Sequence, residues 1–223
     1  MVAQRLSVVV PALNEAAGIR AALEALAPLR RAGHEVIVVD GGSADGTPEL
    51  AAGLCDQVLR TARGRGLQMN AGAHAASGEV LLFLHADTRF PLGGEELIFN
   101  CIKAHLWGRF DVEIGSHHPF LKVVAWAMNL RSRLTGIATG DQAIFVRREA
   151  FRGFPEMALM EDIAFSRAMR RRGPPACLRS RVLTSGRRWE ARGVLRTIAL
   201  MWWLRLRYFL GARPDDLARR YAK

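Results

Sequence analysis

The sequence predicts an α/β fold in which a mixed, mostly parallel sheet is flanked by helices. Two observations carry this prediction. Short runs of Val, Ile and Leu alternate along the first 90 residues with segments whose apolar residues recur at helical spacing. Loops rich in Gly, Asp and Asn follow these runs, as at 11–18 and 40–46. Strands that alternate with helices favour parallel pairing, because each helix carries the chain back across the sheet.

Each predicted strand is a short apolar run bounded by turn-forming residues. The predicted strands are 6–10, 35–39, 57–59, 79–84, 108–114 and 143–146. The predicted helices are 19–31, a short helix that opens at Thr47-Pro48, 67–76, 95–104, 120–134 and 158–172. Thr47 suits an N-cap and Pro48 a first helical turn, while Gly173-Pro174-Pro175 ends the last of these helices. The length fits a single domain, 1–223.

Basic residues are concentrated in the second half of the chain. Of the 32 Lys and Arg residues, 22 follow residue 111, together with only 9 of the 21 Asp and Glu residues. Such an excess fits nucleic acid, an anionic bilayer or a phosphorylated substrate, and equally a solvated Arg-rich surface. The three cysteines have no metal-ligand spacing, which fits a reducing, cytoplasmic setting. We expect neither a secretory signal nor a membrane span, since the longest apolar stretch, 198–204, is far below the roughly 20 residues required.

The segment EVLLFLHADT, residues 79–88, is an apolar strand that ends beside His85 and Asp87. In open α/β sheets, ligands bind outside the carboxyl ends of the strands. A carboxylate at this position can therefore hold a metal ion. The alternative is that Asp87 only caps the next turn together with Thr88.

Other polar residues also follow predicted strands. Asn14 and Glu15 follow the first strand, Asp40 and Asp45 the second, and Glu161 with Asp162 lies near the start of a later helix. A parallel sheet brings successive strand ends to one edge, so the early groups are expected to surround one ligand. Asp40 can accept hydrogen bonds from a nucleobase or ribose, although residues 40–46 also fit a tight turn. The sequence lacks the GxxxxGK[ST] and strand-linked GxGxxG motifs, which excludes the common P-loop and dinucleotide sites.

Six short motifs, taken in their order and spacing, closely resemble those of a bacterial family-2 glycosyltransferase. They are PALNE at 11–15, VVDGGSADGT at 38–47, the Arg-Gly-rich loop with Asn70, LLFLHADT at 81–88, GDQ at 140–142 and MED at 160–162. The resemblance covers nearly the whole chain. It is strongest to the small single-domain subgroup with HAD and GDQAIFVRR motifs, and it implies a GT-A type fold.

This resemblance implies a nucleotide-diphosphate-sugar donor, a divalent metal (Mn or Mg) and inverting transfer to a hydroxyl acceptor. It places the donor and metal in residues 1–110, the acceptor in 111–190, and basic amphipathic helices in 191–223. The implied donor-binding residues are Pro11, Asn14, Glu15, Asp40, Asp45, Arg65, Asn70, His85, Ala86 and Asp87. Asp87 stands at the position of the metal-binding acid. His85 replaces the first acid of the commoner Asp-x-Asp, which leaves open whether residue 85 contacts metal, ribose or neither.

Asp162 matches the family's general base, with Glu161 beside it as a supporting residue. A carboxylate here can take the proton of the attacking acceptor hydroxyl. The alternative is that both acids only favour the helix dipole. Residues of the acceptor or phosphate site are implied to be Gly140, Asp141, Gln142, Arg188 and Trp189. A buried Trp189 with a surface Arg188 is the alternative, and Ser185 replaces the Gln of polymerising members, which argues against processive synthesis.

The segment 194–210 is apolar, with interspersed arginines and with Trp202, Trp203 and Tyr208. These features fit an interfacial helix on an anionic bilayer, and also a helix packed on the sheet. We therefore predict a metal-dependent sugar transferase that acts on a lipid or other hydroxyl acceptor at the cytoplasmic face of the membrane. The alternatives are a nucleic-acid-binding protein and a catalytically silent nucleotide-binding protein. Nucleic acid is not expected as a partner, because the strand-end acids would repel its phosphates.

Overall fold

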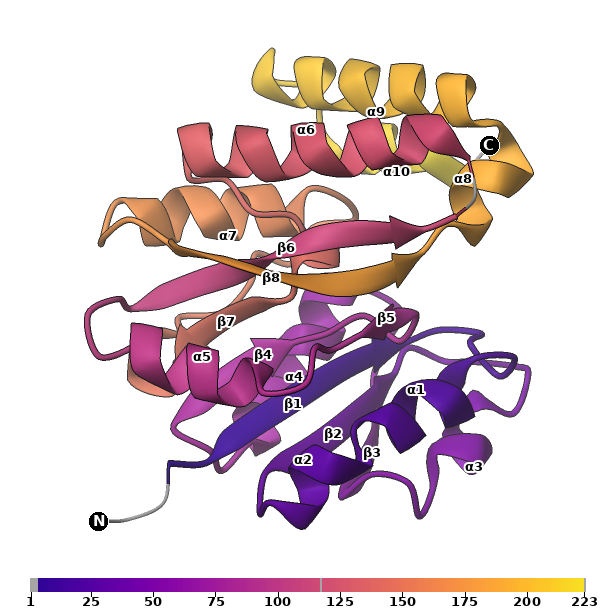
Figure 1. Ribbon diagram of the computed structural model, residues 1–223. Helices are drawn as coiled ribbons and strands as arrows, with labels where there is room; N and C mark the ends of the chain where they lie inside the picture. The colour runs from indigo at the N-terminus through magenta and orange to yellow at the C-terminus, as the bar shows by residue number, and fades with distance from the viewer. Residues whose placement is uncertain (1–3, 117, 223) are drawn as a thin grey trace.

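The computed structural model describes residues 4–116 and 118–222, without the side chains of Arg188 and Ala222. Within these residues, eight strands form one sheet in the order β3-β2-β1-β4-β7-β6-β8-β5 (Figure 1). The strands are β1 (Leu6–Ala12), β2 (Glu35–Asp40), β3 (Gln57–Arg60), β4 (Val80–Phe83), β5 (Thr88–Arg89), β6 (Trp107–Gly115), β7 (Ile144–Arg147) and β8 (Ala176–Ser185).

The strand directions confirm the predicted mixed, mostly parallel sheet. β1 to β4 run parallel, and β7 is antiparallel to its neighbours β4 and β6. β8 is parallel to β6, and the short β5 is antiparallel to β8. The carboxyl ends of β1, β2 and β4 therefore lie at the same edge of the sheet as the beginnings of β5 and β7.

Helices cover both faces of this sheet. They are α1 (Ile19–Ala25), α2 (Ala27–Arg31), α3 (Thr47–Ala51), α4 (Arg65–Ala75), α5 (Gly94–Cys101), α6 (Pro119–Thr135), α7 (Glu161–Arg170), α8 (Arg187–Arg192), α9 (Val194–Phe209) and α10 (Pro214–Ala222). Two 3₁₀ turns, η1 (Gly140–Gln142) and η2 (Arg148–Ala150), flank β7. Figure 1 shows α6 and α9 together at the end of the molecule beyond β6 and β8.

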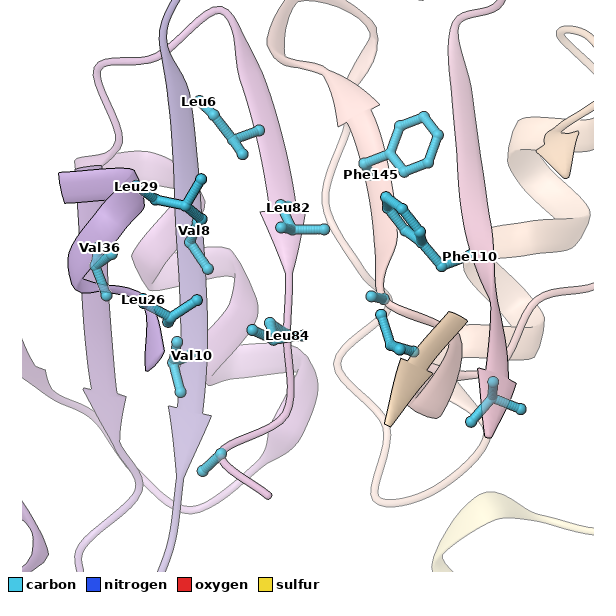
Figure 2. Packing of buried hydrophobic residues seen from close by; sticks show 14 of the residues in the cluster. Leu6, Val8, Val10, Leu26, Leu29, Val36, Leu82, Leu84, Phe110 and Phe145 are labelled. Carbon is cyan, nitrogen blue, oxygen red and sulfur yellow. The ribbon is translucent and has the colours of Figure 1, made fainter. Parts of the chain in front are cut away.

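The core has two main layers, one on each face of the sheet. Val8 and Val10 of β1 belong to the layer that includes residues of α1, α2, α5 and α6, whereas Val9 belongs to the layer with α4 and α7 on the opposite face. Figure 2 shows the first layer, in which β1 lies against Leu26 and Leu29 while Phe110 and Phe145 fill the space further along the sheet. This alternation follows from the twofold side-chain period of a strand. A smaller cluster joins α9 and α10 to the start of α7.

Several predicted boundaries are wrong for local reasons. The helix expected at 19–31 is two helices, and the second contains Pro28 in its first turn, where a missing N–H is tolerated. The helix expected from 158 begins at Glu161, because Met160 has a left-handed φ of 71°. Gly46, not Thr47, occupies the N-cap of α3. β8 was not predicted, because its exposed Arg179 and Arg181 obscure a weak alternation of apolar and polar residues.

Candidate active site

The loops after β1 and β2 hold each other through side-chain to backbone hydrogen bonds. Asn14, with a φ of 55°, accepts from Ala44 N at 3.0 Å. Asp45 accepts from Ala16 N at 2.9 Å and from the Thr47 hydroxyl at 2.6 Å. The Thr47 hydroxyl and the Ala16 N–H hold the pKa of Asp45 below its ordinary value. Asn14 and Asp45, both predicted to bind the donor, therefore shape the loops that form one wall of the site.

Asp40 places a carboxylate at the end of β2 with its side chain almost fully buried. One carboxylate oxygen, Oδ2, accepts from Gly42 N and Ser43 N, both at 3.0 Å. The other oxygen, Oδ1, is buried and has no partner within the described part of the chain. Buried acceptors are nearly always hydrogen-bonded in folded proteins. The free oxygen is thus suited to accept an N–H or O–H group of a ligand.

Two further residues support this region and were not predicted from the sequence. Gln68 of α4 donates to Ala12 O and Val39 O, both at 2.8 Å, and so joins the ends of β1 and β2. Arg187 of α8 lies 3.1 Å from the Glu15 carboxylate and brings the carboxyl-terminal segment to the first loop. Neither residue belongs to a recognisable pattern, since each contact joins segments distant in sequence.

His85 follows β4 and is directed at the turn that precedes β7. Its Nδ1 lies 3.3 Å from Asp141 Oδ1, while Nε2 is buried without a partner in the described residues. A Cβ at Gly140 would approach Nε2 to 2.5 Å, so only glycine leaves room for the ring. The imidazole is therefore held between Gly140 and Asp141, which brings the HAD and GDQ motifs together.

Asp87 lies near the same edge and is partly exposed. Its main-chain oxygen accepts from Ser185 N at 3.1 Å, and its Oδ1 accepts from the Thr88 hydroxyl at a long 3.3 Å. The Ala86 side chain is part of the core, so only its backbone is available to a ligand. Among residues 4–116 and 118–222, no group of three His, Cys, Asp or Glu side chains could hold a metal ion. Asp87 could hold a cation that takes other ligands from water or bound phosphates, as Mg²⁺ commonly does.

Asp162 and Glu161 open α7 on the opposite wall of the site. Asp162 accepts from Gly140 N at 2.9 Å and from Ile163 N at 2.7 Å, which orients the carboxylate. Glu161 is buried, and its Oε1 lies 3.4 Å from Arg65 Nη1. Burial raises the pKa of Glu161, and the adjacent Asp162 raises it further because two negative charges repel.

Arg65 partly offsets the charge of these acids. Burial alone would lower the pKa of Arg65, yet Glu161, Asp141 and Asp162 together hold it above its ordinary value. A small pocket lies among these groups. It is lined by Arg65, Met69, Phe83, His85, Gly140, Ile144, Phe154, Glu161 and Asp162.

The remaining predicted residues whose side chains are described do not line this pocket. Asn70 holds the Phe154 backbone, donating to its O at 2.9 Å and accepting from its N at 2.7 Å. Gln142 is buried and donates to Asn129 Oδ1 at 3.3 Å. Trp189 is partly buried against the core, and Pro11 is part of β1. The Arg188 side chain lies outside the described part of the chain.

Comparison with known proteins identifies relatives of this chain. The model of glycosyl transferase family 2 matches residues 7–162. PGL/p-HBAD biosynthesis glycosyltransferases of Mycobacterium bovis and Mycobacterium tuberculosis are 32% identical over 126 residues, covering 53% of this chain and 45% of theirs. An uncharacterised glycosyltransferase of M. tuberculosis is 31% identical over 143 residues, covering 60% of this chain and 64% of its own. The chain thus spans less than two thirds of the length of these curated relatives.

Solved structures share the fold. Staphylococcus aureus TarS (residues 1–349, with UDP-GlcNAc) has a TM-score of 0.63 at 20% identity, covering 82% of this chain and 58% of its own. Glucosyl-3-phosphoglycerate synthase of M. tuberculosis, in complex with Mn²⁺, UDP and glucosyl-3-phosphoglycerate, has a TM-score of 0.61 at 21% identity, covering 82% and 71%. These similarities confirm the predicted GT-A type fold.

Proposed function

The chain belongs to glycosyl transferase family 2, and we propose that it is a glycosyltransferase that transfers a sugar from a nucleotide-diphosphate donor to a hydroxyl acceptor with inversion. One observation carries the proposal. A single edge of the sheet gathers the partnerless oxygen of Asp40, the carboxylate of Asp87 and the oriented carboxylate of Asp162. These groups suit, in turn, the base or ribose, the phosphates with their counter-ion, and the attacking hydroxyl.

In this proposal the nucleoside lies against the loops after β1 and β2. The free Oδ1 of Asp40 accepts a hydrogen bond from the base or ribose, and the rigid loops at Asn14 and Asp45 form the wall. Two of the similar structures were solved with UDP or a UDP-sugar, which supports a nucleotide-sugar as the donor class. Asp87 would hold Mn or Mg together with the donor phosphates, and such a cation supplies positive charge where the leaving diphosphate becomes more negative.

Asp162 serves as the general base. Its carboxylate takes the proton of the acceptor hydroxyl while that oxygen forms a bond to the anomeric carbon. The bond from this carbon to the diphosphate oxygen breaks, and its electron pair leaves with the nucleotide diphosphate. The hydrogen bonds from Gly140 N and Ile163 N hold the carboxylate in one orientation. His85 and Asp141 support the position of Asp162, because they fix the turn at Gly140, whose N–H is bonded to this carboxylate.

We also propose that the acceptor is a lipid or another apolar molecule, met at the inner face of the membrane. Two stripes of exposed apolar side chains support this idea. They are Phe120, Val123, Trp126, Leu130 and Leu134 on α6, and Leu195, Trp202, Leu206 and Phe209 on α9 together with Leu210 directly after it. No helix in the described residues is long and apolar enough to cross a membrane. The stripes are therefore suited to peripheral contact, with aromatic side chains at the interface.

The test separates a transferase from a silent nucleotide-binding protein and from a nucleic-acid-binding protein. A panel of nucleotide sugars is screened by thermal shift with and without Mn²⁺, followed by turnover of the best donor. Asp162→Asn should abolish turnover and retain donor binding, whereas Asp215→Asn, an exposed acid in the first turn of α10, should change neither. Near-normal turnover in Asp162→Asn would exclude Asp162 as the base. Binding of nucleic acid without any nucleotide-sugar effect would overturn the proposal.

A further inference from the structure

A second, larger cavity lies between α6, α7 and α9 and encloses about 440 Å³. It is lined by Arg131, Thr135, Ile137, Ile163, Arg167, Arg170, Arg171, Arg205 and Phe209. We call it the arginine pocket. More than half of these lining residues are arginines, and none of the described lining residues is acidic. The pocket is thus strongly positive without carboxylates in its own wall.

Arg131 has buried guanidinium nitrogens without partners, and Arg205, which is half-buried, faces the same pocket. Nε and Nη2 of Arg131 are buried and have no hydrogen-bond partner in the described residues. Arg205 forms neither a hydrogen bond nor an ion pair with its side chain in that same part of the chain. Burial lowers the pKa of both groups, that of Arg131 to about 10, and the charge of Arg205 lowers that of Arg131 further. Partnerless buried charges are rare, because desolvation is not repaid without a counter-charge.

The arginine pocket adjoins the proposed general base. Ile163 lines this pocket, whereas the preceding residue, Asp162, lines the small pocket with His85. The first turn of α7 therefore stands between the two cavities, and consecutive Cα atoms are only about 3.8 Å apart. The charges of Asp162 and Asp141 also act on Arg131 and Arg205. A molecule held in the arginine pocket thus lies against the turn of α7 that carries the proposed base.

We propose that the arginine pocket binds a phosphate monoester on the acceptor, so that this transferase glycosylates a phosphorylated molecule. The inference rests on the function proposed above, because it assigns the acceptor of the same reaction. A phosphate dianion supplies the missing counter-charge, and its oxygens match the planar fork of guanidinium donors. The volume also falls in the range of small-molecule sites.

The phosphate can belong to a soluble compound or to a lipid headgroup. Phe209 lines the pocket and is also 58% exposed, so the wall of the pocket continues into the apolar stripe of α9. Both sources present the same monoester chemistry to the arginines. The experiment therefore has a soluble arm and a vesicle arm.

The soluble arm measures binding of sn-glycerol 3-phosphate, with glycerol as the uncharged comparison. The vesicle arm compares phosphatidylcholine vesicles that carry phosphatidic acid, a monoester, with vesicles that carry phosphatidylglycerol, a diester, at matched surface charge. The test variant is Arg131→Gln/Arg205→Gln. The control is Lys122→Gln/Arg196→Gln, which removes the same charge from exposed positions on the same two helices.

The test variant should lose at least about tenfold in affinity for the monoester in one of the two arms, whereas the control keeps its monoester preference. The arm that responds identifies the source of the phosphate. Equal loss in both double variants, or an unchanged preference in the test variant, would overturn the proposal. UDP binding is measured on the same samples and should persist in both variants. Absence of UDP binding in the unaltered protein would instead contradict the proposed transferase function. The phosphate measurements would still test the arginine pocket.

A cooperative unfolding transition checks that each variant is folded. Arg131→Lys/Arg205→Lys provides a second test, since it retains the charge and removes the planar fork. It should bind the monoester more weakly than the unaltered protein and more tightly than the glutamine variant. Identical affinity of the lysine and glutamine variants would show that the charges of the pocket do not bind the phosphate.

Discussion

Replacing Arg131 by methionine should stabilise the ligand-free protein. Two of its guanidinium nitrogens are buried without partners, and burial together with the nearby charge of Arg205 lowers its pKa to about 10, well below the ordinary value of an arginine. One pKa unit corresponds to about 1.4 kcal/mol, so the folded state holds this charge at a cost of about 3 kcal/mol. Methionine keeps an apolar stem of similar length and removes the charge. After allowance for solvent screening and altered packing, we expect a net gain of about 1–2 kcal/mol.

The direction of this stability change follows from the linkage between proton binding and folding. At pH 7 the guanidinium is charged in both the folded and the unfolded state, so the full cost acts on the folded state. It is relieved only as the pH rises through about 10, the folded-state pKa. A neutral substitution therefore reveals the effect better than a change of pH.

Urea unfolding at pH 7 measures this effect, with Lys122→Met as the matched control on the same helix. Lys122 is exposed, so its replacement should alter the free energy of unfolding by less than about 0.5 kcal/mol. Inorganic phosphate should then stabilise the unaltered protein more than Arg131→Met, because binding to the folded state adds RT ln(1 + [L]/Kd). If Arg131→Met is instead less stable than the unaltered protein at an unchanged m-value, the reasoning about its partnerless charge is refuted.

Three other substitutions test the structure around the site. Asp111→Asn should destabilise the protein by about 3–5 kcal/mol in urea unfolding, because Asp111 pairs with Arg109, whose side chain is fully buried. A loss of stability below about 1 kcal/mol would show that the ion pair is dispensable. Gly140→Ala should lower turnover at least about tenfold, since the new Cβ would displace His85. The control variant Gly18→Ala has open space around the new Cβ and should keep its turnover. Equal turnover of the two variants would show that the position of His85 does not matter for the reaction. Glu161→Gln should become more stable relative to the unaltered protein as the pH rises from 4.5 through the raised pKa of Glu161, measured by urea unfolding from pH 4 to 8. A difference that stays constant with pH would show that the pKa of Glu161 is not raised by folding.

The sequence predicts the first half of the fold well, because its central strands are buried on both faces. β1, β2 and β4 are nearly continuous apolar runs, as expected of parallel strands covered by helices on each side. β8 escapes prediction because it lies near the edge of the sheet and exposes Arg179 and Arg181. Short-range patterns identify buried strands, whereas an edge strand depends on neighbours that the local sequence does not reveal.

The candidate site shows the same limit. The order of the motifs predicts that His85 and Asp162 belong to one site, yet the contact between His85 and Asp141 joins residues far apart in the chain. Asn70, which the resemblance implies as a donor-binding residue, holds the backbone of Phe154. The arginine pocket was not predicted, because its arginines come from three helices and each alone resembles a solvated basic residue. Their meeting is a property of the tertiary structure.

The distribution of satisfied and partnerless polar groups distinguishes the two edges of the sheet. At the amino ends of the strands, Glu35 is buried but fully engaged, accepting from the Ser7 hydroxyl at 2.6 Å and from Ser77 N at 2.9 Å. At the opposite edge, Asp40 and His85 keep buried atoms without a partner among the described residues, and so do Arg109 in β6 and Arg131 and Ser132 in α6. Each such atom destabilises the fold by about 1–3 kcal/mol unless something binds it. The two edges share one chain and one sheet, so general packing defects do not explain the difference. A ligand that supplies both a donor for Asp40 and an anion for Arg131 would satisfy both residues, which is what a nucleotide sugar and a phosphorylated acceptor provide together.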